Sequence, residues 1–192
     1  MKLLCFGDSN TFGYDPRSVF GSRYENPWVD ILSAKTGWKV INAGQNGREI
    51  PRRSFELAAF RALVDRCDPE LTVILLGTND LLQGADPETV TARMEGFLRQ
   101  VTVPVLLVAP PPLQRGAWVV DDGLVAASRL LGERYRQLAA HMRIPFVDSG
   151  DWKIPLSFDG VHFSEDGHRI FADHLLAVLK RKETAYGLLC PD

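Results

Sequence analysis

The stretch Leu3-Leu4-Cys5-Phe6-Gly7-Asp8-Ser9-Asn10 joins a short apolar run to a glycine, an acid and a serine. Consecutive apolar residues without alternation are typical of a strand that is covered on both faces, as in parallel sheets. Open α/β sheets bind their ligands at the carboxyl ends of such strands. The sequence therefore predicts a buried first strand that delivers the Ser9 hydroxyl to the ligand-binding edge of a parallel sheet.

Similar apolar runs recur along the chain and alternate with segments of helical periodicity. Strands are expected near residues 2–6, 38–42, 71–76, 104–109 and 144–148, and helices near 27–35, 52–67, 86 onward, 123–142 and 164 onward. Strands that alternate with helices in this way form parallel sheets with helices on both faces. The sequence thus predicts an α/β fold, namely a single-domain, three-layer α/β/α sandwich with a five-stranded parallel sheet in the flavodoxin-like order 2-1-3-4-5.

Length and composition limit the class of protein. The 192 residues suffice for one domain with a full core, which we assign to residues 1–183, followed by a C-terminal tail over 184–192. The hydrophobic share of 45% and the charged share of 24% are ordinary for a soluble globular protein. A net charge of −2 gives no electrostatic reason to bind nucleic acid, and no apolar run is long enough for membrane insertion. Leu188 and Leu189 in the tail suit either a subunit contact in a homo-oligomer or a frayed terminus.

The cysteines bear on cellular location and on cofactors. Cys5, Cys67 and Cys190 are odd in number and far apart, and none belongs to a pair with zinc-binding spacing. Such a pattern is typical of reduced thiols in the cytosol, so a cytoplasmic location is expected. No cluster of histidine, cysteine and carboxylate side chains has metal-binding spacing, and we expect no cofactor.

The segment Asp159-Gly160-Val161-His162 offers what the Ser9 hydroxyl lacks. A serine hydroxyl is protonated at neutral pH, so it needs a base, a group that orients the base, and donors for the oxyanion. Gly160 eases a tight turn in which Asp159 accepts the Nδ1 proton of His162. The imidazole Nε2 is then free to take the serine proton, and we expect His162 to act as the base and Asp159 to orient it.

Two further polar segments follow apolar runs. Asn42-Ala43-Gly44-Gln45-Asn46-Gly47 contains glycine, which can bring a backbone N–H close to a ligand, and Gly77-Thr78-Asn79-Asp80 places an amide at a strand end. Each motif alone occurs in many proteins. Their ordered occurrence, at strand ends and in the last loop, is much less expected by chance.

These four segments, in this order, resemble the SGNH (GDSL-type) hydrolase family from residue 3 to about residue 180. The four signature residues of the family correspond here to Ser9, Gly44, Asn79 and His162. The resemblance implies that Ser9 is the nucleophile, that His162 is a base oriented by Asp159, and that the oxyanion is bound by the N–H groups of Ser9 and Gly44 and the Asn79 amide. The motifs Gly-Thr-Asn-Asp and Asp-Gly-Val-His-Phe are most similar to those of small bacterial aryl- and acetyl-esterases.

Two long loops are expected to leave strand ends beside the predicted nucleophile, at residues 11–26 and 110–123. They carry Phe12, Tyr14 and Trp118, which we interpret as walls of a shallow apolar substrate site. Packing of these rings beneath their own loops or against a second subunit is an equal alternative.

The sequence predicts a serine esterase that hydrolyses a small, preferably acetyl, ester of an aryl alcohol or a carbohydrate through an acyl-enzyme. A lysophospholipase or thioesterase with a longer acyl preference would use the same residues and is one alternative. A non-catalytic carbohydrate-binding protein of the same fold is another. Asn10 stands where the family often has leucine, at a position that is not catalytic in the family.

Overall fold

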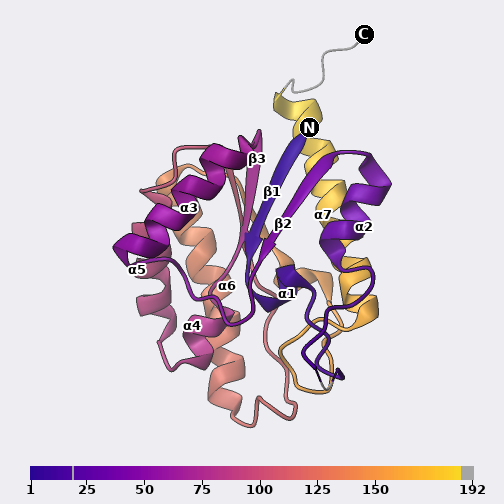
Figure 1. Ribbon diagram of the computed structural model, residues 1–192. Helices are drawn as coiled ribbons and strands as arrows, with labels where there is room; N and C mark the ends of the chain where they lie inside the picture. The colour runs from indigo at the N-terminus through magenta and orange to yellow at the C-terminus, as the bar shows by residue number, and fades with distance from the viewer. Residues whose placement is uncertain (19, 187–192) are drawn as a thin grey trace.

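The apolar run that opens the chain forms the central region of one sheet (Figure 1). The computed structural model describes residues 1–18 and 20–186. The strands of the sheet are β1 (Lys2–Gly7), β2 (Lys39–Gly44), β3 (Leu71–Leu75), β4 (Val105–Ala109) and β5 (Phe146–Asp148). All pair in parallel in the order β2-β1-β3-β4-β5, which confirms the predicted fold class and strand order.

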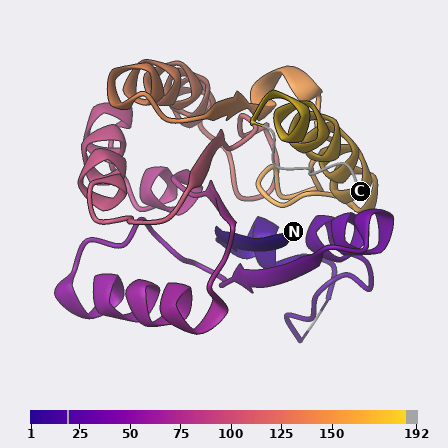
Figure 2. The ribbon, with the colours of Figure 1, turned by 90° about the horizontal axis from the view of Figure 1, so that it is seen from above.

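Long helices cover both faces of the sheet (Figure 2). One layer consists of α2 (Trp28–Thr36) and α7 (Glu165–Tyr186). The other layer consists of α3 (Ser54–Cys67), α5 (Pro87–Leu98) and α6 (Asp122–Met142). Several ends are set by the expected capping residues, such as Asp86, whose side chain accepts the Thr89 N–H before a proline at the first helical position.

Three short helices lie at the carboxyl ends of strands and were not predicted. They are α1 (Ser9–Phe12), α4 (Thr78–Leu82) and the 3₁₀ helix η1 (Ser149–Trp152). Because α1 includes residues 11 and 12, the first long loop begins after it and not at Thr11. These helices matter because α1 and α4 carry two of the predicted site residues.

Side chains of β1 alternate between two separate cores. Leu4 and Phe6 point into the core beneath α3, α5 and α6, whereas Leu3 and Cys5 point into the core beneath α2 and α7. All four are at most 4% exposed. This double coverage is why the strand reads as an unbroken apolar run.

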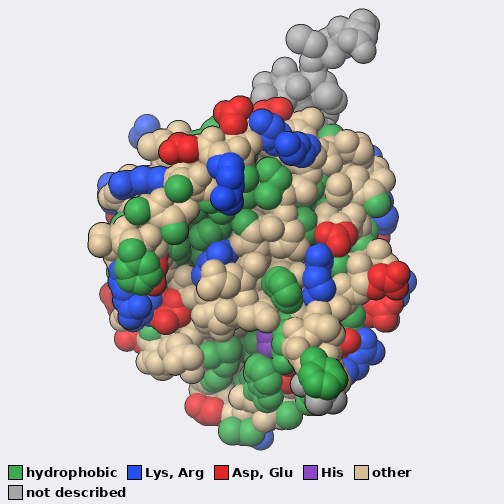
Figure 3. All heavy atoms as spheres, viewed as in Figure 1, with side chains coloured by type: hydrophobic (Ala, Val, Ile, Leu, Met, Phe, Trp, Pro, Cys, Tyr) green, Lys and Arg blue, Asp and Glu red, His purple; other side chains and the backbone are tan. Residues whose placement is uncertain are grey.

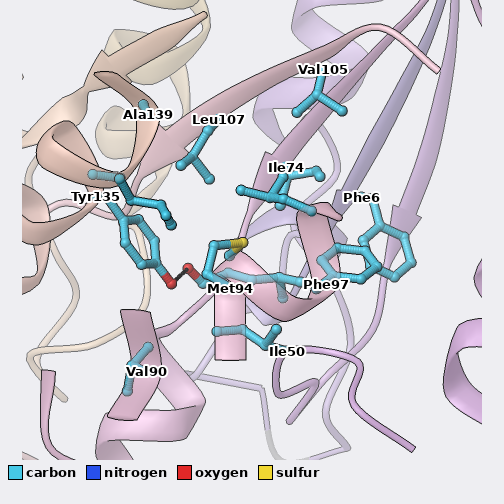
Figure 4. Close-up of a cluster of buried hydrophobic side chains, with 14 of the residues drawn as sticks. Phe6, Ile50, Ile74, Val90, Met94, Phe97, Val105, Leu107, Tyr135 and Ala139 are labelled. Atoms are coloured by element: carbon cyan, nitrogen blue, oxygen red, sulfur yellow. Dashed lines mark hydrogen bonds between the residues drawn. The ribbon is translucent and has the colours of Figure 1, made fainter. Parts of the chain in front are cut away.

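Aromatic side chains pack among aliphatic ones in the first of these cores (Figure 4). The rings of Phe6, Phe60 and Phe97 contact one another with centroid distances of 4.8 to 5.9 Å. The Tyr135 hydroxyl, buried in the same core, donates to the Leu76 carbonyl at 3.2 Å. The cluster thus ties α3, α5 and α6 to the central strands.

The last helix bears on the predicted domain boundary. Helix α7 continues to Tyr186, past the predicted domain boundary at 183, and residues 187–192 with Leu188, Leu189 and Cys190 lie outside the described residues. The division into domain and tail therefore stays a prediction. Over residues 1–18 and 20–186, no helix has both the length and the apolar character that crossing a bilayer requires.

Replacement of Phe97 by alanine is expected to destabilise the fold strongly. The side chain is 1% exposed, and its loss leaves a cavity between two rings, at a cost of about 3–5 kcal/mol in the free energy of unfolding. Phe55→Ala is the matched control, because Phe55 on α3 is 63% exposed. Urea denaturation of both variants measures the difference, and equal losses would contradict the assigned packing.

Candidate active site

Ser9 begins helix α1 directly after β1. A Cβ on Gly7 would lie 2.0 Å from the Thr11 Oγ1, so only glycine permits this tight connection. The Asp8 side chain caps the helix by accepting the Asn10 N–H at 2.9 Å. As a result, the Ser9 hydroxyl, in a residue that is 6% exposed, is held at the carboxyl edge of the sheet.

The His162 imidazole lies between Ser9 and Asp159. Its Nε2 is 3.0 Å from the Ser9 Oγ, and its Nδ1 is 2.6 Å from the Asp159 Oδ2. The other carboxylate oxygen accepts the backbone N–H groups of Val161 and His162 at 2.9 and 3.0 Å. Gly160 makes the turn with a φ of 78°. The structure therefore brings together the three side chains that the sequence singled out for nucleophilic chemistry.

The Asp159 carboxyl group is poised to stay ionised. Burial alone would raise its pKa, but hydrogen bonds from the His162 ring and from the N–H groups of His162 and Val161 outweigh burial and lower the pKa. An ionised Asp159 favours the tautomer with a proton on Nδ1. Nε2 is then the nitrogen that accepts from the Ser9 hydroxyl.

The loop before α6 is bound to the turn that carries Asp159. The N–H groups of Gln114, Ala117 and Trp118 donate to carbonyls of residues 158–160 at 2.9 to 3.1 Å. Gly116 allows this approach, because a Cβ there would lie 2.5 Å from the Asp159 carbonyl carbon. Loop and turn thus form one hydrogen-bonded unit.

A cavity of about 260 Å³ opens beside these groups. Its lining residues are Ser9, Tyr14, Asn46, Gly47, Asn79, Leu82, Trp118, Val161 and His162. The rings of Tyr14 and Trp118 lie 4.7 and 5.2 Å from the imidazole, centroid to centroid. Tyr14 and Trp118, which were predicted to be walls of the substrate site, therefore line the cavity beside Ser9 and His162.

The prediction for Phe12 requires a correction. Phe12 is the last residue of α1 and does not line this cavity, and its ring centroid lies 5.9 Å from the Arg23 guanidinium carbon instead. The sequence analysis placed it in a loop, and a helix of four residues has too little periodicity to be recognised.

The Gly44 N–H, predicted as an oxyanion donor, already has a hydrogen-bond partner in the structure. It donates to the Asn42 Oδ1 at 2.9 Å, and Gly44 does not line the cavity. Gly47 does line it, has a φ of 72°, and its N–H has no hydrogen-bond partner among the described residues. Both glycines stand in the same motif, and only the folded position of the Asn42 side chain distinguishes them.

Asn79 and Arg48 complete this side of the cavity. The Asn79 Nδ2 donates to the Arg48 carbonyl at 3.0 Å, which fixes the amide and leaves its second N–H available. The Arg48 guanidinium donates to the Gly7 carbonyl at 2.8 Å and also to the Ala43 carbonyl. Arg48 therefore holds together the segments that carry Ser9, Gly47 and Asn79, a role that sequence reasoning missed.

Asn10 is a second residue whose role was missed. Its side chain accepts the Phe163 N–H at 2.8 Å and donates to the Val161 carbonyl at 3.2 Å. Asn10 follows Ser9, and the two bonded residues flank His162. This one buried amide therefore fixes the segment of Ser9 to the segment of His162. The signal was the asparagine in place of the family's leucine.

The remaining polar candidates have structural positions. Asp80 accepts the Ile50 N–H at 3.0 Å and an Arg93 guanidinium N–H at 2.8 Å, and so braces the loop before α3. His168 is buried, which lowers its pKa to about 3, and His174 stacks on Trp152 at 5.1 Å. No group of three or more potential metal ligands gathers within residues 1–18 and 20–186.

Comparison with known proteins agrees with this geometry. Residues 5–170 match the GDSL-like Lipase/Acylhydrolase family, which covers most of the sequence. The chain belongs to this family. The predicted resemblance is thereby confirmed, and the protein is a carboxylic ester hydrolase.

Several solved structures and one curated protein are similar to this chain over most of its length. The chain is 25% identical to the M. smegmatis aryl esterase, with a TM-score of 0.81 over 93% of this chain and 98% of that one. It is 26% identical to a carbohydrate acetylesterase family member from Sinorhizobium meliloti, with a TM-score of 0.81 over 94% and 98%. It is also 23% identical to the isoamyl acetate-hydrolyzing esterase of Saccharomyces cerevisiae, over 93% of this chain and 86% of the relative.

Substitution of Asn10 by leucine, the residue often found in the family, is expected to slow ester hydrolysis. Without the two side-chain hydrogen bonds, the imidazole is less well held against the hydroxyl, and small displacements of reacting groups cost up to about 100-fold in rate. We expect kcat to fall by about tenfold or more and KM to change less. Steady-state kinetics on folded protein tests this, and an unchanged kcat would contradict the positioning role.

Replacement of Asp8 by asparagine is expected to change how stability depends on pH. Burial raises the pKa of Asp8 to about 6, against the Asn10 N–H and the nearby His162 and Arg48, which lower it. A carboxyl group that holds its proton more tightly when folded stabilises the protein at low pH, and this contribution is lost as the pH rises through about 6.

Asp8→Asn keeps the hydrogen-bond acceptor but cannot ionise. Relative to the unsubstituted protein, the variant should therefore gain up to about 3 kcal/mol in the free energy of unfolding between about pH 4 and pH 7. Urea denaturation at a series of pH values measures this difference. A difference that does not vary with pH would show that Asp8 does not titrate in this range.

Proposed function

We propose that the protein is a serine esterase that hydrolyses small carboxylic esters, preferably acetyl esters, through an acyl-enzyme. The observation that carries this proposal is the pair of contacts made by His162, at 3.0 Å to the Ser9 Oγ and 2.6 Å to the Asp159 Oδ2. The contacts lie beside a cavity large enough for only a small group.

The first half-reaction forms the acyl-enzyme. The His162 Nε2 takes the hydroxyl proton of Ser9 as the Oγ attacks the acyl carbon of the ester. Asp159 accepts the Nδ1–H hydrogen bond and stabilises the imidazolium that results. The imidazolium then gives its proton to the leaving oxygen, and the alcohol departs.

The second half-reaction releases the acid. Water enters the place of the alcohol, gives a proton to the His162 Nε2 and attacks the same acyl carbon. When the tetrahedral intermediate collapses, the bond to the Ser9 Oγ breaks and the proton returns to that oxygen. The products are the carboxylic acid and the free enzyme.

Three donors are proposed for the oxyanion in both steps. They are the N–H of Ser9, the N–H of Gly47 and the free amide N–H of Asn79. The Ser9 N–H is in the first turn of α1 and has no partner within the helix. Gly47 replaces Gly44 in this proposal, because the Gly44 N–H is already bonded to Asn42. Such donors stabilise charge best when they are fixed before the reaction, as Arg48 fixes Asn79.

A small acyl group is supported by the size and walls of the cavity. Its volume of about 260 Å³ is below the usual range of small-molecule sites, and Tyr14 and Trp118 close two sides. The names of the similar proteins, an aryl esterase, a carbohydrate acetylesterase and an isoamyl acetate-hydrolyzing esterase, support acetyl transfer to water from an aryl, sugar or alkyl alcohol.

One observation favours the alternative with a longer acyl chain. A further hollow of about 330 Å³, lined in part by Pro51, Phe55 and Phe60, shares Gly47 with the small cavity. A long chain that passed over Gly47 would reach it. Each methylene that it buried would add up to about 0.8 kcal/mol of binding free energy.

The cellular location, the oligomeric state and the partners of the protein remain predictions. A cytoplasmic location is supported by Cys5 and Cys67, both free thiols, while Cys190 lies outside the described residues. The possible homo-oligomer and the lack of a nucleic-acid partner rest on the sequence alone.

Covalent labelling followed by a panel of substrates tests the proposal. A fluorophosphonate should label the protein but not Ser9→Ala, and labelling of neither would contradict the role of Ser9 as nucleophile. On p-nitrophenyl esters, kcat/KM should fall steadily from acetate to octanoate. Trp118→Ala should flatten this decline, whereas Phe20→Ala, which alters a side chain that is 97% exposed and outside the cavity, should not. Equal or rising efficiency at octanoate would support the lysophospholipase or thioesterase alternative.

A further inference from the structure

A second cavity lies on the β2 side of the molecule, and the hollow beside Gly47 lies between it and the active-site cavity. It has a volume of about 710 Å³ and shares no lining residue with the cavity at Ser9. Its apolar lining residues are Ile41, Ala43, Ala59, Leu63 and Cys67. We call it the basic groove, for the side chains at its borders. Figure 3 shows this face, with an apolar hollow between basic side chains above β2 and α3.

The basic groove exists because α3 does not cover the edge strand. On α3, Phe60 and Val64 are buried in the core, while Ala59 and Leu63 stay at least partly exposed. On β2, every residue from Lys39 to Gly44 is at least partly exposed, since no strand pairs with its outer edge.

The charges around the groove have one sign. Its charged lining residues are Lys2, Lys39, Arg48 and Arg66, and no carboxylate lines it. The chain as a whole has more acidic than basic residues, 24 against 22, so this excess is local. A cavity lined by charges of one sign concentrates ligands of the opposite sign.

The available hydrogen-bond donors lie at one end of the groove. Lys39 and Arg66 make no hydrogen bond or ion pair with any residue that the structure describes, whereas Lys2 is paired with Asp68 at 3.4 Å. Arg48, at the opposite end of β2, donates to two backbone carbonyls and to the Gln45 side chain. An anionic group would therefore bind at Lys39 and Arg66.

We propose that the basic groove binds an aliphatic carboxylate of medium chain length. The carboxylate contacts Lys39 and Arg66, and the chain lies on the apolar floor between β2 and α3. The unpaired cationic side chains at one end and the apolar surface beyond them are complementary to the two parts of such a ligand, whereas a small polar anion would contact only the charged end and a neutral lipid only the apolar surface. The volume is within the usual range for small-molecule sites. None of the residues proposed for catalysis lines the groove, so the site does not depend on the proposed function.

Calorimetric titration of octanoate into the full-length Ser9→Ala protein tests the site. Octanoate should bind, and the double variant Lys39→Gln/Arg66→Gln should weaken binding by about tenfold or more, because both charged donors are lost. The control Lys35→Gln/Arg61→Gln removes the same net charge outside the groove, where Lys35 is paired with Asp173 and Arg61 with Gln100. It should leave the affinity unchanged.

Two further measurements distinguish the contribution of the charged side chains to binding from that of the apolar residues. Octanol should bind at least about tenfold more weakly than octanoate, since it lacks the charged group. Ala59→Trp fills the groove without changing its charge and should abolish binding, while a urea denaturation curve confirms that it folds.

The proposal is overturned if Ser9→Ala does not bind octanoate at millimolar concentrations, or if the groove and control double variants lose affinity equally. It is also overturned if octanol binds as tightly as octanoate. Loss of affinity in Trp118→Ala, with none in Lys39→Gln/Arg66→Gln, would place the ligand in the active-site cavity instead. Because Ser9→Ala is used throughout, a failure of this site is distinguishable from a failure of the esterase assignment.

Discussion

The contact between the Ser9 Oγ and the His162 Nε2 joins two residues 153 positions apart in the sequence. A parallel sheet makes such a contact possible, because every strand points its carboxyl end to the same edge. Ser9 follows β1 near the centre of that edge, and the turn of His162 comes back to it before α7 begins. The fold brings the backbone segments of Ser9 and His162 near each other, and the hydrogen bonds of the Asn10 amide hold the two segments together. The sheet topology therefore brings the two side chains to the same edge, and local hydrogen bonds set their final positions.

The edge of the sheet is also where the protein places buried acids. Asp8, Asp80 and Asp159 are each at most 2% exposed, and each accepts at least one backbone N–H. Their environments nevertheless differ. Burial raises the pKa of Asp8, whereas hydrogen bonds outweigh burial at Asp159 and lower its pKa. Two carboxyl groups on the same side of the sheet as Ser9 thus have opposite tendencies to ionise, which the folded environment determines.

Much of this structure could be read from the sequence, and the failures have physical causes. The five strands were recognisable because double coverage makes them short apolar runs, and Asp159 was recognisable because three residues separate it from His162. Phe12 was misplaced because a helix of four residues leaves no periodic signal. The hydrogen bond from the Gly44 N–H to Asn42 could not be foreseen, because sequence does not tell which backbone N–H a neighbouring side chain will accept. The basic groove was invisible, since it depends on how far α3 lies from β2.

The hydrogen bonds between the loop of Trp118 and the turn of Asp159 have a consequence for evolution of this enzyme. A wall that could swing outward by itself would let natural selection widen the cavity without disturbing the reacting groups. Here the wall and the acid share one backbone unit, so a displacement that makes room also disturbs the orientation of the imidazole. Broader substrate range therefore has to arise by shortening the Trp118 or Tyr14 side chain in place. Rearrangement of the loop would also displace the turn of Asp159.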